Sequence, residues 1–302
     1  MKALITGICG FSGCYLAEHL IKQKVDVHGV DITSRFPSRW NHFNNKITFY
    51  KADIRDKKKV ETIITKIKPE YIFHLAALLR GDKFENLFDV NVVGTRNILD
   101  AALKTKSRVL ISGSAAEYGL VTKKDLPITE KAPLNPINYY GLSKVAQTML
   151  GMHYFLDKHA KVYPVRVFNM TGPGEPENMV CSSFARQIRN SKTVYVGNLS
   201  PKRDFIDVRD VVRAYWSVIN KGTQGEIYNI SSGKSYSIKE ALSKLIKING
   251  SKGIVIKQSK DKMRKIDIPV HVGDNRKIKK DAGWAPEISF DRTLKDIFEN
   301  LE

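Results

Sequence analysis

The hydrophobic and polar positions along the first half of the chain follow two alternating periods. Short apolar runs, such as residues 2–6 and 71–76, predict buried strands, and apolar residues at helical spacing predict helices between them. The other predicted strands are residues 25–31, 47–53, 108–112 and 163–168, and the predicted helices are residues 13–23, 57–66, 84–104 and 139–158. Repeated β-α-β units of this kind predict an α/β fold, a doubly wound parallel sheet with helices on both faces.

The alternation ends after Asn169, where residues 171–176 form a predicted loop rich in glycine and proline. The elements beyond this loop are more widely spaced and mix helix, loop and short strand. We therefore predict two domains. Residues 1–168 form the sheet domain, and residues 169–302 form a smaller α/β region that mainly binds the substrate, part of which returns to the sheet.

The chain carries a formal net charge of +19, from 50 Lys and Arg against 31 Asp and Glu. The excess is spread along the chain and is mostly lysine, which favours solvated faces over a groove for nucleic acid and suits a small anionic ligand. No apolar run approaches the ~20 residues of a membrane helix, and the N-terminus lacks the pattern of a secretion signal. Cys9, Cys14 and Cys181 have no metal-ligand spacing, so we predict no metal, no membrane partner and a cytoplasmic location.

Three glycines follow the first predicted strand at intervals of three residues and open the first predicted helix: Gly7, Gly10 and Gly13. This position predicts a dinucleotide site of the Rossmann type. Gly7 permits a tight turn, Gly10 lets the backbone approach a diphosphate, and Gly13 lets helix and strand pack closely. The diphosphate then meets the free N–H groups at the start of the helix.

Acidic residues end the second and third predicted strands. The carboxylate of Asp31 can accept hydrogen bonds from the adenosine ribose, which favours NAD(H), or it is a turn residue. Arg35 can instead bind a 2′-phosphate, so the choice between NAD(H) and NADP(H) stays open. Asp53 either faces the adenine or caps the helix that begins near Lys57.

Tyr140 and Lys144 lie four residues apart on the helix predicted over residues 139–158 and therefore share one face. The lysine ammonium can stabilise a tyrosinate and lower the tyrosine pKa towards working pH. Tyr139 lacks such a partner, since Ser143 follows it at that spacing. Ser114 follows another strand that ends at the same crevice, where it either donates a hydrogen bond to a substrate oxygen or caps the strand end.

These motifs together resemble the extended short-chain dehydrogenases/reductases that act on nucleotide sugars. The resemblance spans nearly the whole chain and is carried by residues 6–13, 74–77, 91–95, 114–119, 140–144 and 166–174. It implies a catalytic set of Ser114, Tyr140 and Lys144, and a sugar or diphosphate contact from Asn169, whose alternative is a loop-fixing amide. It further implies a homodimer through the helices beginning at Phe84 and Tyr139, and cofactor contacts from Phe11, Ser12, Ile54, Ala76, Ala77, Tyr140 and Lys144.

The C-terminal half resembles one branch of this family. Residues 196–210 resemble the GDP-mannose 4,6-dehydratases and the reductases of 4-keto-6-deoxymannose, and residues 208–216 and 227–233 resemble the reductases. The resemblance implies that Arg203 and Arg264 hold phosphate oxygens, where a forked guanidinium suits oxyanions, or else form surface ion pairs. Arg80 is unusual at its position and adds an anion contact.

One absence separates the two kinds of enzyme. The dehydratases carry an acid for proton transfer where this chain has Ala116, preceded by Ala115. Glu117 is expected to point to the opposite face of an extended segment. We therefore predict an NAD(P)H-dependent reductase of a nucleotide-linked 4-keto-6-deoxyhexose, GDP-linked, with a product such as GDP-D-rhamnose. A 4-epimerase with retained NAD+ stays open, as does a noncatalytic dinucleotide-sensing or RNA-binding protein of the same fold.

Overall fold

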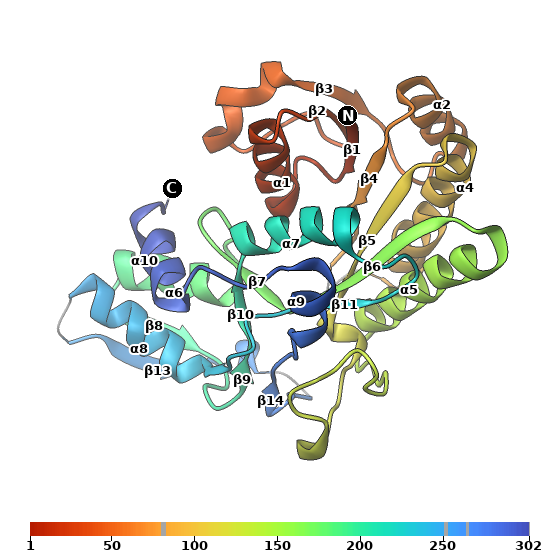
Figure 1. The fold of residues 1–302 in the computed structure, drawn as a ribbon. Helices are drawn as coiled ribbons and strands as arrows, with labels where there is room; N and C mark the ends of the chain where they lie inside the picture. The colour runs from red at the N-terminus through yellow and green to blue at the C-terminus, as the bar shows by residue number, and fades with distance from the viewer. Residues whose placement is uncertain (80–82, 251–252, 264–265, 302) are drawn as a thin grey trace.

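A parallel sheet forms the centre of the molecule (Figure 1). The computed structural model describes residues 1–79, 83–250, 253–263 and 266–301. Within these residues the main sheet has seven strands in the order β11-β6-β5-β4-β1-β2-β3. The strands are β1 (Lys2–Thr6), β2 (Asp26–Asp31), β3 (Ile47–Lys51), β4 (Tyr71–His74), β5 (Arg108–Ser114), β6 (Lys161–Val167) and β11 (Tyr228–Ile230).

Helices cover both faces of this sheet, as the pattern predicted. One face packs against α1 (Phe11–Lys22), α7 (Val208–Lys221) and α9 (Arg276–Ala282), and the other against α2 (Lys57–Ile67), α4 (Thr95–Thr105) and α5 (Tyr139–Lys158). Each face has its own buried hydrophobic cluster. The strand order reverses between β1 and β4, so a crevice for a ligand is expected at the carboxyl ends of these strands.

The helix predicted over residues 84–104 is wrong in one respect, because it contains a π-helical turn. The segment runs as α3 (Phe84–Phe88), a π turn η2 (Asp89–Gly94) and then α4. Within η2, the amide of Asn91 accepts a hydrogen bond from the N–H of Leu78 and donates one to its carbonyl. These bonds to a residue outside the helix hold the extra residue of the π turn in place. Hydrophobic periodicity alone does not predict them. Such single-turn insertions are frequent at functional sites.

The C-terminal part of the chain packs around a separate core at the lower left of Figure 1. This core is formed by α6 (Val180–Asn190), β8 (Thr193–Val196), α8 (Ile238–Asn249), β13 (Val255–Gln258) and α10 (Phe290–Glu299). Short strands link it to the main sheet: β7 (Asn169–Thr171) pairs with β10 (Phe205–Asp207), and β9 (Lys202–Arg203) lies between β12 (Tyr236–Ser237) and β14 (Val270–His271). Strand β11 and helices α7 and α9, also from this half of the sequence, pack with the main sheet.

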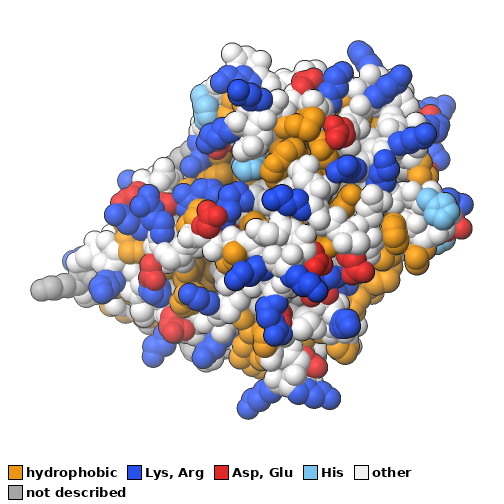
Figure 2. All heavy atoms as spheres, in the orientation of Figure 1, with side chains coloured by type: hydrophobic (Ala, Val, Ile, Leu, Met, Phe, Trp, Pro, Cys, Tyr) orange, Lys and Arg blue, Asp and Glu red, His pale blue; other side chains and the backbone are white. Residues whose placement is uncertain are grey.

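Basic side chains are scattered over the face seen in Figure 2, with acidic side chains among them, rather than gathered into one stripe. Across the described ranges, none of the helices has both the length and the apolar character needed to cross a bilayer. The same part of the chain holds no group of three or more His, Cys, Asp or Glu side chains placed to bind a metal ion. The three cysteines are buried and unpaired with one another.

Candidate active site

The glycine-rich turn lies between β1 and α1, at the edge of the sheet where the strand order reverses. Gly7 has a φ of +72°, and a Cβ there would lie 2.9 Å from the backbone of Ala76. Gly10 precedes α1 without a side-chain cap among the described residues, and the first turn, which begins with Phe11 and Ser12, contains no acidic side chain. The first N–H groups of α1 are therefore left to an external anion, so the turn fits the diphosphate of a dinucleotide.

Asp31 is bonded to the glycine-rich turn. Its carboxylate accepts hydrogen bonds from the N–H of Cys9 at 3.0 Å and from the N–H of Thr33 at 3.2 Å. The residue thus shapes a local turn and also stands beside the turn that would hold the cofactor. Arg35 lies four residues further on with an exposed side chain, and its N–H bonds to the hydroxyl of Thr33.

The other predicted cofactor residues lie at the ends of β3 and β4. Asp53 forms an ion pair with Arg55 at 2.6 Å. The predicted alternative, that Asp53 caps the next helix, is wrong, because Asp56 caps α2 by accepting a hydrogen bond from the N–H of Lys59. Ile54 is buried in the hydrophobic cluster beneath the sheet edge. Ala76 and Ala77 follow β4 and are partly exposed.

Helix α5 carries the predicted catalytic tyrosine and lysine on one face. Asn138 caps the helix by accepting a hydrogen bond from the N–H of Gly141 at 2.8 Å. The ammonium of Lys144 lies 6.0 Å from the ring centre of Tyr140. Tyr139 is 58% exposed on another face, where its ring packs edge-on against Phe84. The register of α5 therefore places Tyr140, and not Tyr139, beside the lysine.

Lys144 is 3% exposed, and its ammonium donates hydrogen bonds to two oxygens. The acceptors are the carbonyl of Ser112 at 2.9 Å and the side-chain oxygen of Gln147 at 2.8 Å. Burial lowers the pKa of Lys144 to about 8, and the carboxylate of Glu117 opposes this effect. The pKa of Lys144 therefore lies close to neutral pH, so the charge of this side chain depends on its neighbours.

Ser114 stands at the end of β5, next to the first turn of α5. Its hydroxyl oxygen accepts a hydrogen bond from the N–H of Ala116 at 3.1 Å, which caps the short 3₁₀ turn η3 (Ala115–Glu117). A Cβ on Gly141 would lie 2.6 Å from the carbonyl oxygen of Ala116, so only glycine lets η3 approach α5 this closely. This contact brings the serine and the tyrosine to the same end of the sheet.

The prediction that Glu117 lies on an extended segment is wrong, because the segment is the 3₁₀ turn η3. The turn directs the side chain into the interior, where Glu117 is fully buried. The carboxylate accepts a hydrogen bond from the N–H of Ser114 at 2.9 Å and pairs with the guanidinium of Arg166 at 2.7 Å. Burial raises the pKa of Glu117, and Arg166 opposes that rise. The Glu117 carboxylate thus fixes the backbone of Ser114 at the end of β5.

Two predicted substrate residues on the C-terminal side are bonded within the protein. Arg203 is 8% exposed and pairs with Asp267 at 2.7 Å, and it donates a further hydrogen bond to the carbonyl of Ile268 at 2.6 Å. The amide of Asn169 donates to the carbonyl of Asp204 at 3.2 Å. The other two predicted substrate residues, Arg80 and Arg264, lie outside the described residues.

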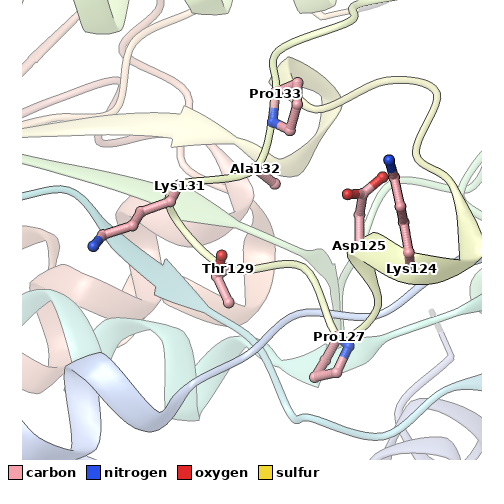
Figure 3. Close-up of a pocket in the computed structure, with 7 residues that line it drawn as sticks. All are labelled: Lys124, Asp125, Pro127, Thr129, Lys131, Ala132 and Pro133. Atoms are coloured by element: carbon pink, nitrogen blue, oxygen red, sulfur yellow. The ribbon is translucent and has the colours of Figure 1, made fainter.

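A hollow of about 250 Å³ is lined by the segment between η3 and α5 (Figure 3). None of Ser114, Tyr140 and Lys144 lines it. The side chains of Lys124 and Asp125 stand at one end of this hollow. The hollow is therefore a feature of the connecting segment and separate from the crevice at the strand ends.

Sequence reasoning did not identify two buried polar residues that hold the catalytic set. Gln147 is fully buried and bonds to Lys144, and Arg166 is buried and pairs with Glu117. The spacing of three residues between Lys144 and Gln147, which places them on one helix face, was the available signal for the first. The partners of Arg166 are distant in the sequence, so no local pattern indicates them.

Comparison with known proteins agrees with this geometry. The family model described as GDP-mannose 4,6 dehydratase matches residues 4–297. A GDP-6-deoxy-D-mannose reductase of Pseudomonas aeruginosa is 32% identical over 247 residues, which are 78% of this chain and 81% of that protein. The chain therefore belongs to the extended short-chain dehydrogenase/reductase family of nucleotide-sugar epimerases and dehydratases.

Two solved structures share the complete fold. A UDP-glucose 4-epimerase with UDP-glucose from Thermotoga maritima superposes with a TM-score of 0.90 at 27% identity, covering 99% of this chain and 98% of that chain. RMD from Pseudomonas aeruginosa, complexed with NADPH, superposes with a TM-score of 0.85 at 26% identity, with the same coverage. The protein is thus an NAD(P)-dependent oxidoreductase or epimerase that acts on nucleotide sugars.

Proposed function

We propose that this protein reduces the C4 keto group of a GDP-linked 4-keto-6-deoxyhexose with NADH or NADPH. The substrate class is represented by GDP-4-keto-6-deoxy-D-mannose, and the product is a GDP-6-deoxyhexose such as GDP-D-rhamnose. The sequence identity of 32% with the Pseudomonas GDP-6-deoxy-D-mannose reductase supports the choice of substrate. The reduced nicotinamide, when bound, supplies the hydride that C4 accepts.

The roles of the three catalytic residues follow from their chemistry and placement. Tyr140 donates a proton to the oxygen that becomes negative at C4. Ser114, at the end of β5, donates a hydrogen bond to the same oxygen. For this, its hydroxyl proton must face the crevice while the oxygen accepts from the N–H of Ala116. The Lys144 ammonium, 6.0 Å from the ring centre of Tyr140, stabilises the negative charge left on the phenol oxygen and holds the nicotinamide ribose.

The observation that carries the proposal is that the turn after Ser114 has alanine at its first two positions and buries its one acid, Glu117, away from solvent. A 4,6-dehydratase needs a group that moves a proton at C5 and C6 of the sugar. Ala115 and Ala116 have no such group. Glu117, the next residue, is fully buried and paired with Arg166, so its carboxylate has no surface towards a substrate. These three positions support reduction without dehydration.

A 4-epimerase is the second candidate, supported by the superposition on the Thermotoga UDP-glucose 4-epimerase. Epimerisation uses the same Ser, Tyr and Lys chemistry with a retained NAD+, and it needs no acid at positions 115 and 116. The two candidates differ in the fate of the cofactor. A reductase consumes one NAD(P)H for each sugar, whereas an epimerase regenerates its cofactor in each turnover.

The test uses GDP-4-keto-6-deoxymannose generated in situ, with NADH and NADPH oxidation followed at 340 nm and the product examined by NMR. We expect stoichiometric oxidation and a single C4 epimer. Oxidised cofactor that co-purifies with the protein, together with interconversion of C4 epimers and no net oxidation, would instead establish the epimerase. A C6 methyl doublet from GDP-mannose and NAD+ at enzymatic rates would establish a dehydratase. Absence of any turnover with a panel of keto sugars would favour a noncatalytic protein.

We also propose that the protein acts in the cytoplasm as a homodimer formed through the outer face of α5. Three exposed apolar side chains, Leu142, Met149 and Leu156, follow one another at intervals of seven residues along this helix. Phe84 and Tyr139 extend the same surface at one end. Sedimentation equilibrium is expected to give twice the chain mass, and Met149→Lys with Leu156→Lys is expected to give the monomer.

A further inference from the structure

A continuous chain of buried side chains runs from the catalytic lysine to the cofactor side of the sheet. The oxygen of Gln147 accepts a hydrogen bond from Lys144 at 2.8 Å, and its amide nitrogen bonds to the hydroxyl of Thr95 at 2.8 Å. The same hydroxyl lies 2.8 Å from Nε2 of His74, and Nδ1 of His74 lies 2.7 Å from the hydroxyl of Thr6. These five residues are buried, with exposures of 3% or less.

The chemistry of these groups gives every bond in the chain a direction. An ammonium only donates, so Gln147 must turn its oxygen to Lys144 and its NH₂ to Thr95. The Thr95 hydroxyl uses its single proton on the carbonyl of Asn91 at 2.6 Å. It therefore accepts from Nε2–H of His74, which leaves Nδ1 of that ring as an acceptor.

The hydrogen bonds at the cofactor end of this series of side chains agree with the same directions. The hydroxyl of Thr6 donates to Nδ1 of His74 and accepts a hydrogen bond from the N–H of Ala76 at 3.2 Å. Ala76 is a predicted cofactor contact at the end of β4. Burial lowers the pKa of His74 to about 3, and Lys144 adds to this effect, so the ring stays neutral and keeps its two roles as donor and acceptor. No bond in the chain can reverse without leaving a buried polar group unpaired.

We propose that Gln147 is a positioning residue that holds the Lys144 ammonium charged and in place beside Tyr140. The inference rests on the function proposed above for Lys144. The carbonyl of Ser112 and the oxygen of Gln147 take two of the three N–H groups of the ammonium. The third remains for the cofactor ribose. Gln147 cannot rotate away, because its amide nitrogen donates to the Thr95 hydroxyl, and the neutral ring of His74 bonds to that same hydroxyl.

The charge of Lys144 depends on the groups that surround it, and Gln147 is one of them. Glu117 favours the ammonium from η3, whereas burial disfavours it. His74 faces it from β4 as a neutral ring, and the Tyr140 ring lies on the same helix. Arg166, from β6, pairs with Glu117 and so weakens the field of that carboxylate. The Gln147 oxygen is the uncharged acceptor that bonds directly to the ammonium, so its removal shifts the balance towards the neutral amine.

Two substitutions test the inference in opposite directions. Gln147→Met keeps the length of the side chain but removes the acceptor, so the pKa of Lys144 falls. Gln147→Glu places a carboxylate against the ammonium, so that pKa rises. NADH affinity, measured by fluorescence between pH 6 and 10 on the intact protein, reports the midpoint at which the Lys144 charge is lost. We expect the midpoint to fall by about one unit in Gln147→Met and to rise by about one unit in Gln147→Glu.

Activity supplies the second measurement. With the 4-keto sugar, kcat of Gln147→Met at pH 8 is expected to fall by up to ~10²-fold while KM for the sugar changes little, and to recover partly at pH 7. Tyr154→Phe is the matched control, because it removes another partly buried hydrogen bond from α5, the one to Asp100 at 2.6 Å. This variant is expected to lose stability without moving the midpoint.

Each outcome decides between the two proposals. Equal losses of affinity in both Gln147 variants, with the wild-type midpoint, would overturn the positioning role and leave a structural one. Wild-type NADH binding without reduction of any keto sugar would overturn the proposed function alone, while the midpoints still test Gln147. A wild-type protein that binds neither NADH nor NADPH would overturn both.

Discussion

The two sides of the crevice hold their polar side chains in different ways. On the sheet side, Lys144 and Ser114 are bonded to the side chains of Gln147 and Glu117, which are themselves fully buried. On the C-terminal side, Arg203 and Asn169 bond largely to main-chain carbonyls, those of Lys202, Ile268 and Asp204. The groups assigned to chemistry are thus oriented before a substrate arrives. The groups assigned to recognition must exchange a protein acceptor for the substrate.

The largest effect is expected on the sheet side, at the proton donor. Tyr140→Phe removes one hydroxyl with little change in volume, so the fold should persist. Since general acid catalysis contributes typically ~10²–10⁴-fold, kcat for keto-sugar reduction should fall by about that factor. Tyr139→Phe is the control, because that ring is 58% exposed and faces Phe84. Comparable losses in both variants would contradict the assignment of the acid.

The second effect concerns stability, and it compares a buried ion pair with an exposed one. Glu117→Gln leaves the Arg166 charge buried without its partner, so the free energy of unfolding is expected to fall by about 3–5 kcal/mol. Glu61 pairs with Lys104 on the surface, and Glu61→Gln should cost about 1 kcal/mol or less. Urea unfolding followed by circular dichroism measures both. If Glu117→Gln proves as mild as Glu61→Gln, the buried pair does not support Ser114 as inferred.

The sheet could be predicted from the sequence because its signals are local. Each strand of the first half is a short apolar run, and residues 2–6 and 139–158 have the same bounds in β1 and α5 as in the prediction. The glycine-rich turn and the tyrosine–lysine spacing are also local, so the structure brings these motifs to one end of the sheet. The return of β11 to that sheet was foreseen only in outline, since its pairing with β6 joins residues about 63 positions apart.

The remaining parts of the site depend on contacts that have no local pattern. The conformation of the segment around Glu117 was wrongly predicted as extended, because it is a 3₁₀ turn whose acid pairs with Arg166, 49 residues away. The π turn around Asn91 depends in the same way on Leu78 and Ser143. Periodicity describes how a segment faces a core, and it does not contain the polar partners that bend the segment.

A third prediction concerns the cofactor side of the crevice. Asp31→Ala removes the carboxylate that holds the N–H of Cys9 and is assigned to the adenosine ribose. Loss of hydrogen bonds to a charged acceptor should weaken NADH binding by about tenfold or more. Fluorescence titration with NADH and NADPH checks this. Improved NADPH binding would indicate that Arg35 serves the 2′-phosphate, whereas unchanged affinity for NADH would remove Asp31 from the cofactor site.

The smallest expected effect tests the C-terminal side, where Arg203 is paired with Asp267 at 2.7 Å. If Arg203 moves to a substrate phosphate, the carboxylate of Asp267 competes with that phosphate for the same guanidinium. Asp267→Asn weakens the competitor, so KM for the GDP-sugar should fall about two- to tenfold, the equivalent of one hydrogen bond, with kcat unchanged.

Arg203→Lys provides the complementary change, because an ammonium cannot make the paired bonds of a guanidinium, and KM should rise. A purely structural pair predicts a different result, in which both variants lower the unfolding midpoint and leave KM as it was. The sign of the change in KM therefore decides the comparison between the two sides of the crevice. A fall in KM for Asp267→Asn means that recognition begins by breaking an internal ion pair, whereas the catalytic side needs no such exchange.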